Sequence, residues 1–201
     1  MRSFVVFLVV TLNSLLLPAA MAADMRAITE DGRKVLLSPD GKWRFDTRGP
    51  AAMNGAGDSP YQTRVKKFSL AFNTDEWRLL PPKDEEPNKR TLQHKTLPIH
   101  ALIVADEIPA KTETMKEVIL HNVKSAGASS TVLLDTTEPL GDKQVGAIRL
   151  AASVKGMDFV FSTYYYADDD GNIQVTCFTG QSLFFKYQSD CQKLLSGLTI
   201  K

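Results

Sequence analysis

Hydrophobic and polar positions alternate along much of the second half of the chain, as they do in half-buried β-strands. The run at residues 145–154 places its apolar side chains on one face, and the run at 158–167 is aromatic on both faces. An Asp-rich turn at 168–172 leads into a third run, at 172–179. Because short turns join these runs, the strands must pair antiparallel. The pattern predicts an antiparallel sheet that is covered on both faces.

The first half of the main region adds strands, and helices separate or follow the runs. Strands are predicted at residues 65–72, 101–108 and 131–135, helices at 111–126 and 182–195, and a polar, proline-rich loop at 81–97. Thr112 and Ser182 are the expected N-caps of the two helices. The predicted fold class is α+β: a twisted antiparallel β-sheet flanked by helices in an α/β/α sandwich, with a small N-terminal β-meander.

Four segments organise the chain: a signal peptide at residues 1–22, a small β-meander module at 23–46, a flexible linker at 47–61 and the α+β domain at 62–201. The meander is predicted from two Asp-Gly turn signals, each followed by a short strand-like run. The linker is predicted from its Gly, Ala, Pro and Ser content and its lack of periodicity.

The N-terminus has the features of a secretory signal. Arg2 precedes an apolar run that ends at Pro18, and Ala20 and Ala22 supply the small residues of a cleavage site. We therefore expect an exported protein, periplasmic or extracellular, with no integral membrane segment after cleavage.

The charge of the exported chain is balanced, because removal of Arg2 leaves 23 basic and 23 acidic residues. Such balance argues against a nucleic-acid partner. Cys177 and Cys191 are the two cysteines. In an exported protein they could form a disulfide, or both could stay reduced and buried, and the sequence leaves both possibilities open.

No motif with a catalytic or metal-binding mechanism stands out. His94, His100 and His121 lack zinc-site spacing, and the acidic run at 168–170 fits a solvated hairpin tip better than a calcium loop. Ser182 lacks the surroundings of a nucleophile elbow. We predict no catalytic residue, no metal site and no cofactor.

Aromatic residues supply the candidate binding surface. Phe159 and Phe161 belong to the same aromatic-rich sheet, one face of which is expected to be core and the other a binding patch. The residues predicted to form this surface are Tyr164, Tyr165, Tyr166, Trp77 and Phe178. The alternative is that these side chains all pack in the core.

Two segments resemble the last hairpin and the closing helix of the PsbP-like and Mog-like α/β/α sandwich superfamily: FVFSTYYYADDDGNIQVTCFTG and FFKYQSDCQKLLSGL. The upstream strands and helix occur in the order that this fold has. The DGRKVLL…DGKWRF stretch is similar to a short module of exported bacterial proteins of unknown function. The resemblance implies a non-catalytic accessory or binding protein, although functions differ widely within the superfamily.

Three functional hypotheses follow. The first is an exported, non-enzymatic accessory protein that binds a protein partner in the cell envelope. The second is a small-molecule carrier or sensor with a pocket between sheet and helix, lined by Tyr165, Phe178 and Trp77. The third is a hydrolase whose catalytic residues meet only in the folded chain.

Overall fold

The computed structural model describes residues 25–28, 34–38, 40–45, 58–83, 85–125 and 129–201. These residues fall into two compact units, one before residue 46 and a main unit from residue 58 onward. The predicted signal peptide and most of the predicted linker lie outside the described residues. The domain boundaries therefore stay a prediction.

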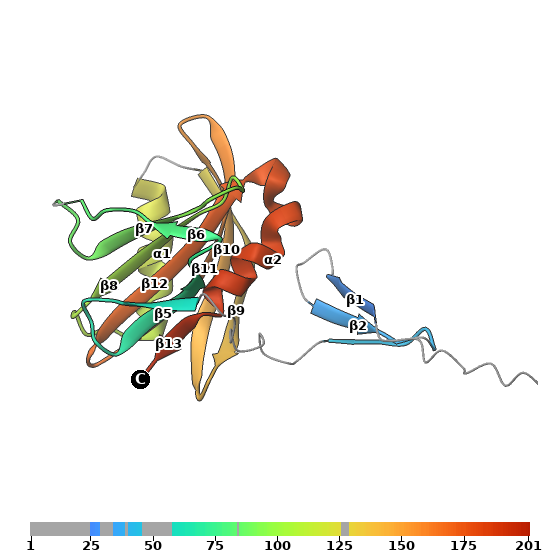
Figure 1. Ribbon diagram of the computed structural model, residues 1–201, viewed down its shortest axis with the longest axis horizontal. Coiled ribbons are helices and arrows are strands. Elements are labelled where there is room, and N and C mark those ends of the chain that lie inside the picture. Colours follow the sequence, from blue (N-terminus) through green and yellow to red (C-terminus); the bar gives the residue numbers. More distant parts are fainter. Residues whose placement is uncertain (1–24, 29–33, 39, 46–57, 84, 126–128) are drawn as a thin grey trace, which may run out of the picture. The chain divides into compact units, whose positions relative to one another are not determined.

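The N-terminal unit is a three-stranded antiparallel sheet in the order β1-β2-β3 (Figure 1). Its strands are β1 (Met25–Ile28), β2 (Lys34–Leu37) and β3 (Trp43–Phe45). At the second turn Gly41 has a φ of +81°, a conformation that glycine adopts without steric cost. The Asp40 carboxylate accepts a 3.1 Å hydrogen bond from the Lys42 backbone N–H. The predicted β-meander is thus confirmed.

The main unit contains two antiparallel sheets. The larger has seven strands in the order β6-β7-β8-β12-β11-β10-β9, and the smaller has the order β13-β5-β4. The strands are β4 (Asp58–Gln62), β5 (Phe68–Asn73), β6 (Trp77–Leu79), β7 (Lys89–His94), β8 (His100–Asp106), β9 (Ser129–Leu140), β10 (Lys143–Val154), β11 (Met157–Asp168), β12 (Gly171–Gly180) and β13 (Leu198–Ile200).

Two helices cover opposite faces of the seven-stranded sheet (Figure 1). Helix α1 (Thr112–Ser125) packs Met115 and Ile119 against Ile148 and Leu150 of β10. Helix α2 (Phe184–Leu195) follows a 3₁₀ turn and packs, together with the small sheet, on the other face. The α+β fold class, with its antiparallel sheet between helices, is confirmed. None of the described helices has the length and hydropathy of a bilayer-spanning segment.

Two strands occupy residues that the sequence analysis assigned to irregular structure. Residues 89–94 form β7, so the loop prediction for 81–97 is wrong over this stretch. The strand has one aliphatic residue, Leu92, which is fully buried, and its other core-facing side chain is His94. Residues 58–61, assigned to the end of the linker, begin β4, which pairs with β5. Both strands form by pairing with the strands next to them in the chain, β4 with β5 and β7 with β6 and β8, rather than through their own alternation.

Both predicted N-caps are wrong. The Thr112 hydroxyl donates to the Ala167 carbonyl at 3.1 Å and accepts from the Ala167 N–H at 3.2 Å, so it joins α1 to β11 instead of capping the helix. Ser182 lies in the 3₁₀ turn, and the N-cap of α2 is Leu183, which makes no side-chain cap. At α1 a tertiary contact thus takes the place of a local cap, whereas α2 continues from the 3₁₀ turn, in which the Phe184 N–H donates to the Gln181 carbonyl.

Candidate binding surface

A strip of aromatic rings crosses three neighbouring strands on the α1 face of the large sheet. Phe178 of β12 pairs directly with His100 of β8 on one side and with Phe161 of β11 on the other. The Phe178 ring stacks on both partners, with centroid separations of 5.6 Å to His100 and 5.4 Å to Phe161. Phe159 lies 6.0 Å from Phe161 and 6.1 Å from Phe178. We call His100, Phe159, Phe161 and Phe178 the aromatic strip.

All four side chains of the aromatic strip are half-buried. The strip is distinct from the core beneath α1, whose fully buried members are Met115, Ile119, Ile148, Leu150, Tyr165 and Ala167. The rings therefore cover the sheet beside the α1 core while one part of each stays accessible. Stacked rings of this kind contribute about 0.5–1.5 kcal/mol per pair beyond the area they bury.

The register extends the strip into a row across the whole sheet. Beyond His100 the row continues to Gln93 of β7 and Arg78 of β6, where the Arg78 guanidinium donates to the Gln93 side-chain oxygen at 2.8 Å. Beyond Phe161 it continues to Leu150 of β10 and Val132 of β9. The surface is thus polar at one sheet edge, aromatic at the centre and aliphatic at the other edge.

The side chains in the rows next to the strip form hydrogen bonds with one another or are buried. The hydroxyls of Thr163 and Thr176 are buried and share a 2.9 Å hydrogen bond, and Gln174 donates to Thr176 at 3.1 Å. One row further, Tyr165 is buried under α1. The side chains beside the strip are thus held by hydrogen bonds and packing, and the rings of the strip contact one another.

The structure distributes the five predicted surface residues over both sheet faces. Phe178 lies in the aromatic strip, and Tyr165 shares its face but is 4% exposed. Tyr164 and Trp77, each 4% exposed, belong to the core on the α2 face. Tyr166 is half-buried on that same face and makes an edge contact with Phe68. The carrier hypothesis requires Trp77 and Tyr165 to line the same pocket. They lie on opposite faces of the sheet and therefore cannot do so.

His100 is the member of the strip that sequence reasoning missed. Its signal was its position one residue before the predicted strand at 101–108. Alternation places His100 on the same face as Leu102, but only the register with β12 brings it beside Phe178. Pairing between strands separated by a helix and three other strands cannot be read from one sequence.

Burial holds the phenols of the core neutral. Burial and the charge of Glu138 raise the pKa of Tyr164 to about 12, although the hydrogen bond from Gln192 and the charge of Arg149 act in the opposite direction. Burial, followed by the charge of Asp135, raises the pKa of Tyr165. Neither phenol can serve as a base near neutral pH.

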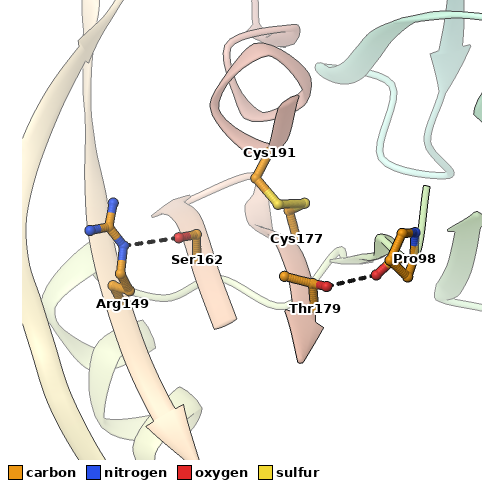
Figure 2. Close-up of a disulfide and its surroundings, with 6 residues drawn as sticks. All are labelled: Pro98, Arg149, Ser162, Cys177, Thr179 and Cys191. Atoms are coloured by element: carbon orange, nitrogen blue, oxygen red, sulfur yellow. Dashed lines mark hydrogen bonds between the residues drawn. A yellow bond between two sulfur atoms is a disulfide. The ribbon is translucent and has the colours of Figure 1, made fainter. Parts of the chain in front are cut away.

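A disulfide fixes the strand that carries Phe178 (Figure 2). Cys177 of β12 is bonded to Cys191 of α2, with a Cα–Cα distance of 5.5 Å, and both are buried. Two residues after Cys177, the Thr179 hydroxyl donates to the Pro98 carbonyl at 2.7 Å. Of the two possibilities left open by the sequence, the structure contains the bonded pair.

The α2 face also holds a buried guanidinium. Arg149 of β10 is 7% exposed, and its Nε donates to the Ser162 hydroxyl at 3.2 Å (Figure 2). The guanidinium carbon lies 4.9 Å from the centroid of the Phe184 ring. The charge is thus stabilised by a hydrogen bond and a cation–π contact at the start of α2.

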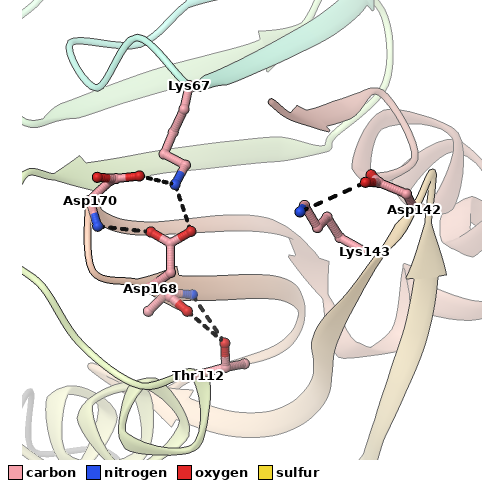
Figure 3. A network of polar contacts seen from close by, with 7 residues as sticks. Lys67, Thr112, Asp142, Lys143, Asp168 and Asp170 are labelled. Carbon is pink, nitrogen blue, oxygen red and sulfur yellow. Dashed lines mark hydrogen bonds and ion pairs between the residues drawn. The ribbon is translucent and has the colours of Figure 1, made fainter.

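The acidic hairpin at 168–170 binds a cation supplied by the chain itself (Figure 3). The Lys67 ammonium donates to Asp168 at 2.6 Å and to Asp170 at 2.8 Å. The Asp170 N–H also donates to the Asp168 carboxylate at 3.0 Å. These contacts join the β11–β12 turn to the start of the small sheet, where the sequence suggested a solvated tip.

The other histidines considered as metal ligands, His94 and His121, lie apart from each other. His94 accepts hydrogen bonds from the N–H groups of Thr96 and Leu97 and contacts the Trp77 ring, whereas His121 is exposed on α1. Within the described part of the chain, no three His, Cys, Asp or Glu residues form a group able to hold a metal ion.

Comparison with known proteins identifies the fold and no more. No family model matches the chain, and no curated protein matches it. The solution structure of cyanobacterial PsbP (CyanoP) from Synechocystis sp. PCC 6803 matches with a TM-score of 0.56 at 10% identity, over 76% of this chain and 98% of that one.

Two further structures are similar. A protein from Bacteroides thetaiotaomicron matches with a TM-score of 0.50 at 7% identity, over 73% of this chain and 49% of its own length. The Ran-binding protein Mog1p of Saccharomyces cerevisiae matches with a TM-score of 0.49 at 6% identity, over 73% of this chain and 96% of that one. The match to CyanoP shows that the main unit of this chain has the PsbP-like fold.

Proposed function

We propose that this chain is an exported, non-enzymatic accessory protein that binds a protein partner in the cell envelope through the aromatic strip. The observation that carries the proposal is the stack of His100, Phe178 and Phe161 across three strands, with part of each ring accessible. Aromatic side chains are enriched at the centres of protein interfaces. These rings are already ordered, so binding costs little side-chain entropy.

Two independent features support an exported protein. The disulfide between Cys177 and Cys191 is of a kind that persists in oxidising compartments such as the periplasm and the extracellular space. The first 22 residues have the pattern of a secretory signal.

The surroundings of the strip favour binding over catalysis. The His100 imidazole stacks on Phe178, and the nearest buried phenol, Tyr165, has a raised pKa. The neighbouring hydroxyls, Thr163 and Thr176, are hydrogen-bonded to each other. The surface thus offers a partner aromatic and aliphatic groups, which are the chemistry of an interface.

Site-specific photocrosslinking in the native host tests the proposal. Phe161 is replaced with p-benzoylphenylalanine, which preserves an aromatic ring in the strip. The matched control carries the same group at Phe185, which is 72% exposed on α2. We expect one discrete adduct with an envelope protein from position 161 and none of the same mass from position 185.

A second pair of variants links the adduct to the strip. Phe178→Asp places a charge at the centre of the stack and should abolish crosslinking from position 161, whereas Phe185→Asp should leave it intact. Circular dichroism and thermal unfolding establish that both variants are folded. Identical adducts from positions 161 and 185, or no adduct from position 161, would refute the proposed binding surface.

A further inference from the structure

The hairpin between β10 and β11 extends the accessible apolar surface beyond the aromatic strip. Strand β11 carries Phe159 and Phe161 of the strip, and alternation places Met157 on the same face, two residues before Phe159. Met157 is 58% exposed and therefore more accessible than the half-buried rings. The apolar surface thus continues from the strip to the end of the hairpin.

The turn of this hairpin contains a residue that its geometry does not favour. Val154 pairs with Met157, so Lys155 and Gly156 form the turn, and their φ angles are +52° and +78°. Positive φ at both central positions is the pattern of a type I′ turn, which favours Asn-Gly. Lys155 is the single non-glycine residue with a positive φ among those that the structure describes. The turn gives no reason for a lysine here, and backbone strain of this kind is concentrated at functional sites.

Cationic groups lie at both ends of the accessible surface. Lys155 is exposed at the hairpin tip. Arg78 lies at the other end, on β6, in the same row of the sheet as the strip. One of its N–H groups donates to Gln93, and a guanidinium has five such donors, so others are available to a partner.

The carboxylates that follow or precede these cations in the sequence do not neutralise them. Alternation places Asp158 on the opposite face of β11 from Met157. Glu76, two residues before Arg78, binds the Lys193 ammonium of α2 at 2.9 Å. The strip and its two ends therefore present apolar groups and positive charge, and the complementary surface is apolar and negatively charged.

We propose that the protein partner carries a carboxylate beside an apolar segment. The apolar side chains of the partner pack on Met157 and the aromatic strip, and its carboxylate pairs with the Lys155 ammonium. The inference rests on the proposed function and states the chemistry of the partner. A charge pair at the rim mainly orients the partner and excludes surfaces of the wrong charge, whereas the aromatic rings supply most of the binding free energy.

The effect of the charge is measured by photocrosslinking in the native host, with p-benzoylphenylalanine in place of Phe161. Lys155→Glu should lower the adduct yield about tenfold or more, because it brings two negative charges together. Lys155→Arg keeps the positive charge and should retain the adduct. Lys66→Glu makes the same change of net charge at an exposed position before β5 and is the matched control, with the yield of the wild type.

A further variant, Lys155→Asn, separates binding from the stability of the turn. Asparagine is favoured at this position of a type I′ turn, so the midpoint of thermal unfolding should rise. The adduct yield should fall by up to about fivefold, the loss expected for one exposed ion pair. A lysine with a merely structural role would leave the yield unchanged in this more stable variant, and that result would overturn the inference.

A second crosslinking position, with p-benzoylphenylalanine in place of Met157, should capture the same protein as position 161. If position 161 gives no adduct in the otherwise wild-type chain, the proposed binding surface fails and the inference falls with it. If that adduct forms but its yield is unchanged in Lys155→Glu, the inference alone is overturned. It is also overturned if position 157 captures a lipid or a different protein.

Discussion

At the scale of single residues, the α1 core depends on a position that has no side chain. Gly146 of β10 pairs with Tyr165 of β11, and the Tyr165 ring lies over the glycine backbone. A Cβ at Gly146 would overlap ring atoms Cζ, Cε2 and Oη. Because Tyr165 packs in the core beneath α1, a displacement of its ring would disturb that packing.

The first prediction concerns this glycine. Gly146→Ala should lower the free energy of unfolding by about 1–3 kcal/mol, because the added methyl group displaces the buried Tyr165 ring. Gly180→Ala is the matched control, since a Cβ there meets nothing within 4 Å and the backbone is not in the left-handed region. Chemical denaturation measures both. Equal stability of the two variants would show that Tyr165 can move without cost.

A second residue-scale prediction concerns Lys67 and its two carboxylates. Burial raises the pKa of Asp168, but hydrogen bonds from Lys67 and from the Asp170 N–H outweigh it and leave the pKa below the ordinary value of 3.8. The hydrogen bonds that Lys67 donates to the Asp168 and Asp170 carboxylates raise the pKa of Lys67 above 10.5. The ion pairs therefore stabilise the folded state between these limits.

Lys67→Met should lower the free energy of unfolding at pH 7 by about 0.5–1 kcal/mol, because the pairs are partly exposed. The difference from the wild type should shrink as the pH falls below about 4, where Asp168 becomes protonated, and as it rises above about 10.5. Denaturation curves at several pH values test this. Lys66→Met, at an exposed neighbouring position, is the control. A difference that is independent of pH would exclude the ion pairs as its cause.

At the scale of elements, β12 is the strand on which the surface depends. Phe178 faces the aromatic strip, and the adjacent Cys177 faces α2 and is bonded to it. Alternation along a strand places these two side chains on opposite faces. The disulfide therefore holds α2 on the far side of the strand that carries the central ring of the strip.

The prediction for this element concerns the disulfide. The Cys177→Ala, Cys191→Ala double variant should lose about 3 kcal/mol of unfolding free energy, because the bond closes a loop with a sequence separation of 14. Adding a reductant should destabilise the wild type but leave the double variant unchanged. Because both sulfurs are buried, reduction of the folded wild type should be slow without denaturant. A double variant as stable as the wild type would show that packing alone holds α2.

At the scale of the whole molecule, the described residues form two units separated by a Gly-, Ala- and Pro-rich stretch. The main unit has its own core, which includes Phe68, Leu70 and Ile103. A domain with its own core can fold by itself. The main unit should therefore be stable without residues 25–46.

Limited proteolysis tests this organisation. Protease should cut a chain that begins at residue 23 within residues 47–57 and leave a fragment that begins near β4. The midpoint of thermal unfolding of this fragment should match that of the main transition of the intact chain. Mass spectrometry locates the cut. A first cut within the 80–88 loop, or a fragment that unfolds at a much lower temperature, would contradict the independence of the main unit.

Much of the fold could be predicted because long periodic patterns of apolar residues indicate strands and helices directly. Three strands were predicted from such runs, at 145–154, 158–167 and 172–179, and each is present in the structure. The helical spacing of apolar residues in 111–126 likewise predicted α1. β7 escaped prediction because only Leu92 in it is aliphatic. Its burial comes from neighbours that the local sequence does not contain.

The candidate surface was predictable only in part. Aromatic content pointed to β11 and β12, and Phe178 was among the residues named. Which aromatic side chains lie in the core and which stay accessible depends on where α1, α2 and the small sheet pack. Tyr164 and Tyr165 are adjacent in sequence, yet each enters a different core.

The antiparallel sheet, its two helices and the N-terminal meander could be predicted from local sequence, because side-chain periodicity and Asp-Gly turns act over a few residues. Three contacts could be known only from the folded chain: the bond between Cys177 and Cys191, the binding of Lys67 to the acidic hairpin and the place of His100 in the aromatic strip. These contacts join residues from separate elements. They arise from strand register and helix placement, which depend on the packing of the whole chain.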